Sequence, residues 1–135
     1  MIEGEKWDEI TAISKEAVKT MLGFSLAHVG VNCGSPEEAE KVAKALCALF
    51  GLEYKAGNSS NFAGKAVECM KKPDARGTNG HIAIGTNSVD RAIFHLGHQG
   101  VEFIEESRVL DAKGKTKAIY IKGEIGGFAI HLMQK

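Results

Sequence analysis

Four side chains of the types that bind divalent metals recur at matched places in two halves of the sequence. His28 opens residues 28–31 (HVGV), and His81 opens the similar residues 81–84 (HIAI). Glu68 and His131 hold equivalent places in two later segments, 64–70 and 127–133. Imidazole and carboxylate groups are ligands that first-row divalent metals accept. The repeat therefore predicts one metal site, with Zn, Ni, Mn and Fe as candidate ions.

The four candidate ligands lie in segments that read as β-strands, where side chains alternate between two faces. A single His in a strand is usually a structural residue, but four polar residues sharing one face favour a metal site or an anion site. Small residues two positions away leave room above that face: Gly30, Ala66, Ala83 and Ala129. The alternate positions are apolar and are expected to face helices: Val29, Val31, Cys33, Val67, Cys69, Ile82, Ile84, Ile130 and Leu132.

The first half reads as a helix, a strand, a second helix and further strands. Apolar residues recur every three or four positions over 5–22, which predicts an amphipathic helix that ends at Gly23. A strand is expected over 25–33. Ser35 is placed to cap the next helix, with Pro36 at its first position and Glu38 three residues after the cap. That helix is expected to end at Gly51.

The second half repeats this order and adds a hairpin. Asn87 or Ser88 caps a helix, residues 111–114 form a hairpin turn, and a strand is expected over 118–122. The polar segment 71–79 reads as a linker between the halves. The class is α+β: an N-terminal helix over 1–23 and one domain over 24–135, built from modules 24–72 and 78–135.

Length and composition limit the partners. The chain has 135 residues, 44% of them hydrophobic, which suits one globular domain. Lys plus Arg and Asp plus Glu each number 17, so no charge excess indicates a nucleic acid or an anionic membrane as partner. No segment is apolar enough for a signal peptide or a membrane span, and we expect a cytoplasmic protein that binds a small molecule.

Other reactive residues are expected to be structural. Cys33, Cys47 and Cys69 show no metal-site or disulfide spacing, so packing is the better explanation for them. His95 and His98 lie near a helix end, outside the repeat, and are expected at the surface. Three further polar residues have strand registers that the sequence leaves open by one position, so they are not assigned to the site: Tyr54, Tyr120 and Lys122.

Residues 24–135 resemble the vicinal oxygen chelate superfamily, which includes glyoxalase I, extradiol dioxygenases and methylmalonyl-CoA epimerase. The resemblance rests on paired modules that open with His-x-x-x strands at His28 and His81 and close with the strands that carry Glu68 and His131. It implies paired βαβββ modules in a curled eight-stranded mixed sheet around a divalent metal. It also implies that His28, Glu68, His81 and His131 are the ligands, and that Glu68 and His131 are the candidates for proton transfer.

The last ligand departs from the pattern of that superfamily, which usually has Glu where this chain has His131. Three neutral imidazoles and one carboxylate leave a bound divalent ion with one net positive charge, whereas two His and two Glu would leave none. An anionic ligand would therefore be held more tightly here. The substitution also removes one candidate base and makes glyoxalase I activity doubtful.

Residues 7–18 resemble the closing helix of 2-keto-3-deoxy-6-phosphogluconate aldolase, and the similarity continues through residues 21–24 into 27–32. Some bacterial forms of that aldolase look as if they carry a similar domain after this helix. The chain resembles such an appended domain, without the aldolase barrel and its Schiff-base lysine. This implies an association with the aldolase but not its aldol cleavage.

Three functions fit these observations. The first is a metal-dependent lyase or isomerase of the glyoxalase type, or a sensor, for an oxo-acid or sugar-acid metabolite. The second is a non-catalytic module that binds a small molecule without metal. The third is an assembly domain whose N-terminal helix docks on a barrel or on a second copy through Trp7, Ile10 and Ile13. A homodimer is expected in each case.

Overall fold

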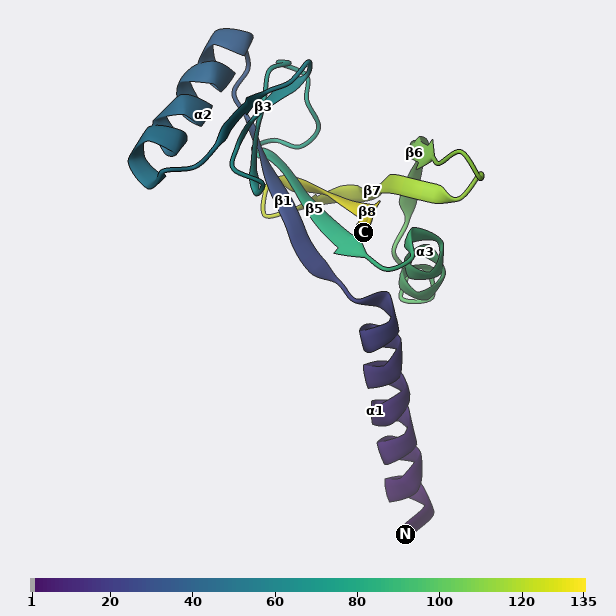
Figure 1. The fold of residues 1–135 in the computed structure, drawn as a ribbon. Helices are drawn as coiled ribbons and strands as arrows, with labels where there is room; N and C mark the ends of the chain where they lie inside the picture. The colour runs from purple at the N-terminus through teal and green to yellow at the C-terminus, as the bar shows by residue number, and fades with distance from the viewer. Residues whose placement is uncertain (1) are drawn as a thin grey trace.

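The computed structural model describes residues 2–135, with side chains from Asp8 onward. Within this range the chain forms three helices and eight strands (Figure 1), with the following bounds: α1 Ile2–Leu22, β1 Ser25–Asn32, α2 Pro36–Phe50, β2 Tyr54–Ala56, β3 Ser60–Ala63, β4 Val67–Met70, β5 Gly80–Thr86, α3 Val89–Gly97, β6 Phe103–Leu110, β7 Thr116–Ile125 and β8 Phe128–Gln134.

All eight strands belong to one mixed sheet, in the order β2-β3-β4-β1-β5-β8-β7-β6. The two halves meet through β1 and β5, which pair antiparallel. On the outer side of this central pair, β1 pairs parallel with β4, and β5 pairs parallel with β8. The four strands that carry the candidate ligands are therefore neighbours at the centre of the sheet.

The expectation of a curled sheet was wrong in degree, because the sheet is not strongly curled. Its edge strands, β2 and β6, each pair with only one neighbour, so no backbone hydrogen bonds draw the two edges together. The α+β class and the eight-stranded mixed sheet are confirmed. On the face that carries the candidate ligands, His81 is buried, whereas the side chains of His28 and Glu68 keep 14% and 17% of their surface exposed.

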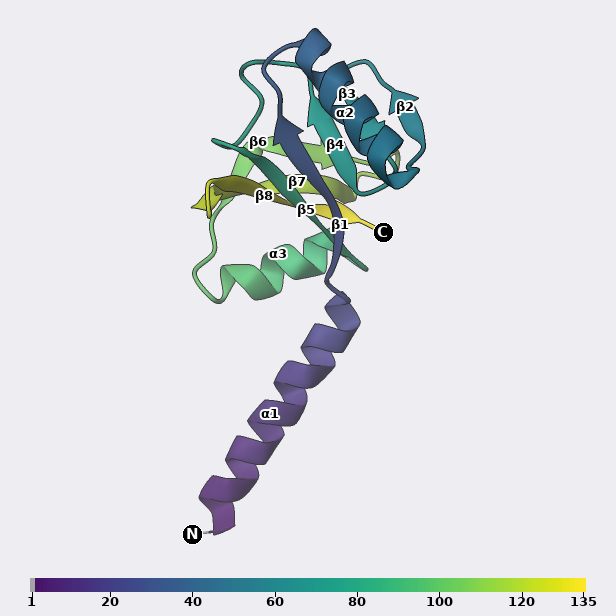
Figure 2. The same ribbon diagram turned by 90° about the vertical axis from the view of Figure 1, so that its left-hand side faces the viewer.

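Both domain helices cover the opposite face (Figure 2). Helix α2 packs through Ala39 and Ala43 on β3 and β4, where Cys69 is fully buried. Helix α3 packs through Val89 and Ala92 against β7 and β8. Burying these apolar residues stabilises the sheet from one side.

The helix ends follow the sequence signals. The Ser35 hydroxyl accepts the amide N–H of Glu38 at 3.1 Å, and α2 ends at Gly51 in the left-handed conformation with φ 66°. In α3, Ser88 is the cap and accepts the amide N–H of Arg91 at 3.2 Å. Asn87, the other candidate, instead donates to the Met21 carbonyl at 3.0 Å.

Helix α1 projects away from the body of the molecule (Figures 1 and 2). Only its last turns contact the domain, where Leu22 is buried and Val18 and Met21 pack beside it. Ile10 is 51% exposed and Ile13 is 69% exposed, so this stripe is not part of the core. Met1 and the side chain of Trp7 lie outside the described part. No helix in that part is both long and apolar enough to span a membrane.

Candidate metal centre

The strand pairing places the four predicted ligands in two rows across the sheet. In the first row, Gly30 on β1 lies between Glu68 on β4 and His81 on β5. In the second row, Ala83 on β5 lies between His28 on β1 and His131 on β8. A small residue therefore occupies the middle of each row, and the longer side chains on both sides reach over it.

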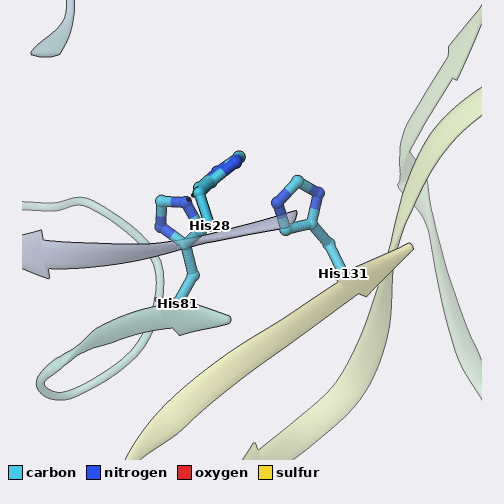
Figure 3. Close-up of side chains that lie close together, drawn as sticks. All are labelled: His28, His81 and His131. Carbon is cyan, nitrogen blue, oxygen red and sulfur yellow. Dashed lines mark hydrogen bonds between the residues drawn. The ribbon is translucent and has the colours of Figure 1, made fainter. Parts of the chain in front are cut away.

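The histidines converge above the sheet (Figure 3). They rise from β1, β5 and β8, and each offers a ring nitrogen such that all three nitrogens lie within 4.8 Å of one another. The Nε2 atoms of His28 and His81 are 3.2 Å apart. The carboxylate of Glu68 joins them, with Oε1 3.4 Å from Nε2 of His28 and 3.0 Å from Nε2 of His81. Glu68 therefore contacts His28 and His81, and His131 lies with these two histidines in the group of three imidazoles.

The separations among His28, His81 and Glu68 fit ligands of one metal ion. Ligand atoms about 2.1 Å from a metal lie about 3.0 Å apart at right angles and about 3.4 Å apart in tetrahedral geometry. The three measured distances, 3.0, 3.2 and 3.4 Å, span the same interval. Nε2 of His131 is buried and has no hydrogen-bond partner in the described structure. A buried ring nitrogen without a partner is costly, and a bound ion would satisfy it.

Glu68 is held in its ionised form. Burial opposes ionisation, but hydrogen bonding to His28, His81 and Ser60 outweighs burial and keeps the pKa of Glu68 well below its ordinary value of 4.5. The Ser60 hydroxyl donates to Oε2 at 2.8 Å, which leaves Oε1 facing the imidazoles. Ser60 thus orients the carboxylate, as residues behind metal ligands commonly do.

His131 is held in its neutral form. Burial, followed by the neighbouring His81 and His28, lowers the pKa of His131 from 6.5 to about 4. The ring of Tyr120 stacks on His131, with centroids 4.7 Å apart and planes at 19°. A neutral imidazole is the form that binds a metal, so His131 is ready to coordinate at pH 7 without losing a proton.

Sequence reasoning missed several residues beside the cluster. Ser60 bonds Glu68, and the ring of Phe62 meets His28 edge-on at 5.9 Å. Strand alternation alone could have placed both on the ligand face if β3 had been located, because Phe62 pairs with Glu68. Tyr120 is brought to the site by its pairing with His131, and Arg76 reaches it from the linker.

The remaining candidates lie elsewhere. Tyr54 packs with the core under α2, and Lys122 is 68% exposed beside Glu102. His98 is exposed and its Nδ1 contacts the Phe94 carbonyl at 2.8 Å. The three cysteines are free and lie in or against the α2 core, as their packing interpretation predicted. A cavity of about 410 Å³ between the start of α2 and strands β2 and β3 shares no residue with the cluster.

Comparisons with known proteins rest on structure. No protein-family model and no curated sequence matches the chain. A hypothetical protein from Bacillus halodurans C-125 is 19% identical, with a TM-score of 0.57, covering 83% of this chain and 94% of that chain. Methylmalonyl-CoA epimerase from Mycobacterium tuberculosis is 17% identical, with a TM-score of 0.58, covering 84% and 89%. The chain has the vicinal oxygen chelate fold.

A third similar structure is methylmalonyl-CoA epimerase from Streptomyces coelicolor in complex with 2-nitronate-propionyl-CoA, 14% identical with a TM-score of 0.56. It covers 82% of this chain and 94% of its own. At these identities the likeness establishes the vicinal oxygen chelate fold and no more. The resemblance to an aldolase-appended domain is not found among these structures.

Proposed function

We propose that the chain holds a divalent metal ion through His28, Glu68, His81 and His131 and uses it to bind a small oxo-acid or sugar-acid. The observation that carries the proposal is the group of three imidazoles whose ring nitrogens lie within 4.8 Å of one another, in which Nε2 of His131 is buried and has no hydrogen-bond partner among the described residues. A bound divalent ion supplies a Lewis acid that polarises a ligand oxygen. The side chains of His28 and Glu68 are partly exposed, at 14% and 17%, which gives a ligand access.

The chain's own residues suit an anionic ligand. Three imidazoles contribute no charge when neutral, and Glu68 contributes one negative charge, so the loaded centre keeps a positive charge. Glu68 is ionised and His131 is neutral at pH 7, so both are in the form that accepts a proton. These two residues are our candidates for proton transfer in a lyase or isomerase reaction of the glyoxalase type.

Metal titration of purified protein tests this proposal. After removal of metal with a chelator, we expect one equivalent of Zn, Ni, Mn or Fe to bind. His28→Ala and His81→Ala should each lose the binding, whereas His98→Ala, outside the cluster, should retain it. Wild-type protein that takes up none of these ions in stoichiometric amount would remove the proposal.

An acyl-CoA is the second candidate ligand, because several of the similar structures are methylmalonyl-CoA epimerases and some of these are complexes with 2-nitronate-propionyl-CoA. The alternative of a binding module without metal makes a different prediction. Thermal-shift screening of oxo-acids, sugar acids and acyl-CoAs with and without chelator separates the two, because a ligand bound only by the native state raises its apparent stability. Stabilisation that survives chelation favours the metal-free module.

An assembly role for α1 is favoured by the exposed Ile10 and Ile13. Isolated helices of this length are marginal in water, so a free helix gains stability from a partner. The partner is a second copy or, as the aldolase resemblance implies, a barrel domain. Deleting residues 1–14, which keeps Val18, Met21 and Leu22 on the domain, and measuring mass in solution tests the homodimer. A mass that stays dimeric after the deletion would count against α1 as the interface.

A further inference from the structure

The positively charged side chain of Arg76 lies beside the candidate metal centre. The guanidinium of Arg76 lies over the ring of Tyr120, with Cζ 4.9 Å from the ring centroid. Tyr120 stacks in turn on His131. Arg76 is an exposed residue of the linker between the two modules, so its guanidinium reaches the edge of the site from outside the sheet.

The backbone around Arg76 is fixed by hydrogen bonds from both modules. The Nδ2 group of Asn32, at the end of β1, donates to the Gly77 carbonyl at 2.7 Å and also contacts the Ala75 carbonyl at 3.4 Å. At the end of the same segment, the backbone N–H of Asn79 donates to the Gly127 carbonyl at 2.9 Å. The fold therefore sets the position from which the Arg76 side chain starts.

Arg76 has no anionic partner of its own. Among the side chains described from Asp8 onward, no carboxylate lies within ion-pair distance of it, whereas Arg108 pairs with Glu105 and Asp90. A guanidinium stacked on an aromatic ring keeps its N–H edge free. That edge donates two parallel hydrogen bonds, a pattern that fits a carboxylate or a phosphate.

We infer that Arg76 binds a second anionic group, a carboxylate or a phosphate, on the oxo-acid that the metal centre holds. The inference rests on the proposed function, in which the metal centre binds the oxo-acid group of the ligand. Tyr120 contacts both binding points, because its ring stacks on His131 and carries the Arg76 guanidinium. The ligand class is therefore an oxo-acid with an anionic group at its far end, rather than a monoanionic oxo-acid.

Calorimetric binding to metal-loaded protein tests the inference with three probes: pyruvate, which has one anionic group, 2-oxoglutarate, which adds a carboxylate, and phosphonopyruvate, which adds a phosphonate. We expect wild-type protein to bind one of the two dianions at least about tenfold more tightly than pyruvate. Arg76→Ala should remove this preference while metal affinity stays unchanged. Arg76→Lys should restore part of this preference, because lysine supplies the positive charge but not the two parallel hydrogen bonds of a guanidinium.

Arg91→Ala is the matched control, because Arg91 is also exposed but lies on α3, on the helix side of the sheet. It should leave the preference intact. Two results would overturn this inference and leave the proposed metal site intact. The first is equal affinity of the metal-loaded protein for all three probes, and the second is a preference for a probe with two anionic groups that survives Arg76→Ala. Failure of wild-type protein to bind metal would instead overturn the proposed function, and this inference with it.

Discussion

The imidazole of His81 lies against the Cα of Gly30 on the neighbouring strand. A Cβ built at Gly30 would come within 2.6 Å of Nε2 of His81 and closer still to Cε1 and Nδ1. Because Gly30 has no Cβ, the ring of His81 can occupy the space above it and turn toward His28 and Glu68. This contact couples Gly30, which has no side chain, to the geometry of the candidate metal centre.

Gly30→Ala should displace His81 and weaken metal binding by at least about tenfold. It should also destabilise the fold by about 1 to 3 kcal/mol, because an added methyl in a packed site forces its neighbours to move. Isothermal titration with metal and urea unfolding measure the two effects. Gly97→Ala is the control, since a Cβ there meets nothing within 4 Å. Unchanged metal affinity in Gly30→Ala would contradict the prediction.

His131→Ala should lower metal affinity by at least about 100-fold, because it removes a ligand whose Nε2 has no other partner. His131→Glu should retain binding, since it supplies a carboxylate ligand at the same place. The comparison of both variants with wild type by metal titration checks this. Equal affinity of His131→Ala and wild type would mean that His131 is not a ligand.

Stability of the metal-free protein should fall as the pH drops from 6.5 to about 4. The pKa of His131 is about 4 in the folded protein and near 6.5 when unfolded, so in this window the unfolded chain binds a proton that the folded chain excludes. The loss should be on the order of 2 to 3 kcal/mol, with little change above pH 6.5 from this group.

Urea unfolding in the presence of a chelator, repeated across this pH range, measures the effect. His131→Gln should flatten the curve between pH 6.5 and 4, whereas His98→Gln, which removes an exposed imidazole, should leave its slope unchanged. Below pH 4.5 the protonation of Glu68 adds a further loss, because its pKa is also lowered by folding. A slope that persists in His131→Gln would assign the effect to another group.

Thr86→Val should loosen the junction between α1 and the domain. The buried Thr86 hydroxyl donates to the Leu22 carbonyl at 2.7 Å, and valine removes this donor, while the backbone N–H of Asn87 still donates to the same carbonyl at 2.8 Å. We expect a cost of about 0.5 to 1.5 kcal/mol in unfolding free energy, the net value of one hydrogen bond. Thr20→Val, at an exposed position of α1, serves as the control and should change stability little. Equal stabilities for the two variants would refute this role of Thr86.

Local signals in the sequence predicted most elements because they act over a few residues. Ser35 with Pro36 and Gly51 fixed both ends of α2, as capping and the left-handed glycine require. Residues 71–79, expected as a linker, form neither a helix nor a strand and connect β4 to β5. The apolar period of the first helix was informative about its length but not about its burial. The exposed Ile10 and Ile13 show that apolar residues at helical spacing do not reveal which surface they contact.

The degree of curl and the residues around the site could not be read from the sequence. Curl depends on how eight strands twist together and on whether edge strands meet, which no local pattern specifies. Tyr120 was left unassigned because a shift of one residue reverses the face of a strand. Arg76 was missed because linker composition carries no information about which ring its side chain reaches.

The repeat by itself determined which four side chains share a face, because strand alternation has a period of two and both halves use the same parity. Only the tertiary structure decided how far apart they stand. The pairing of β1 with β5 brings the halves together, and the small residues Gly30 and Ala83 let the rings lean over the centre. Those distances come from strand register across the chain, a property that no single segment of the sequence carries.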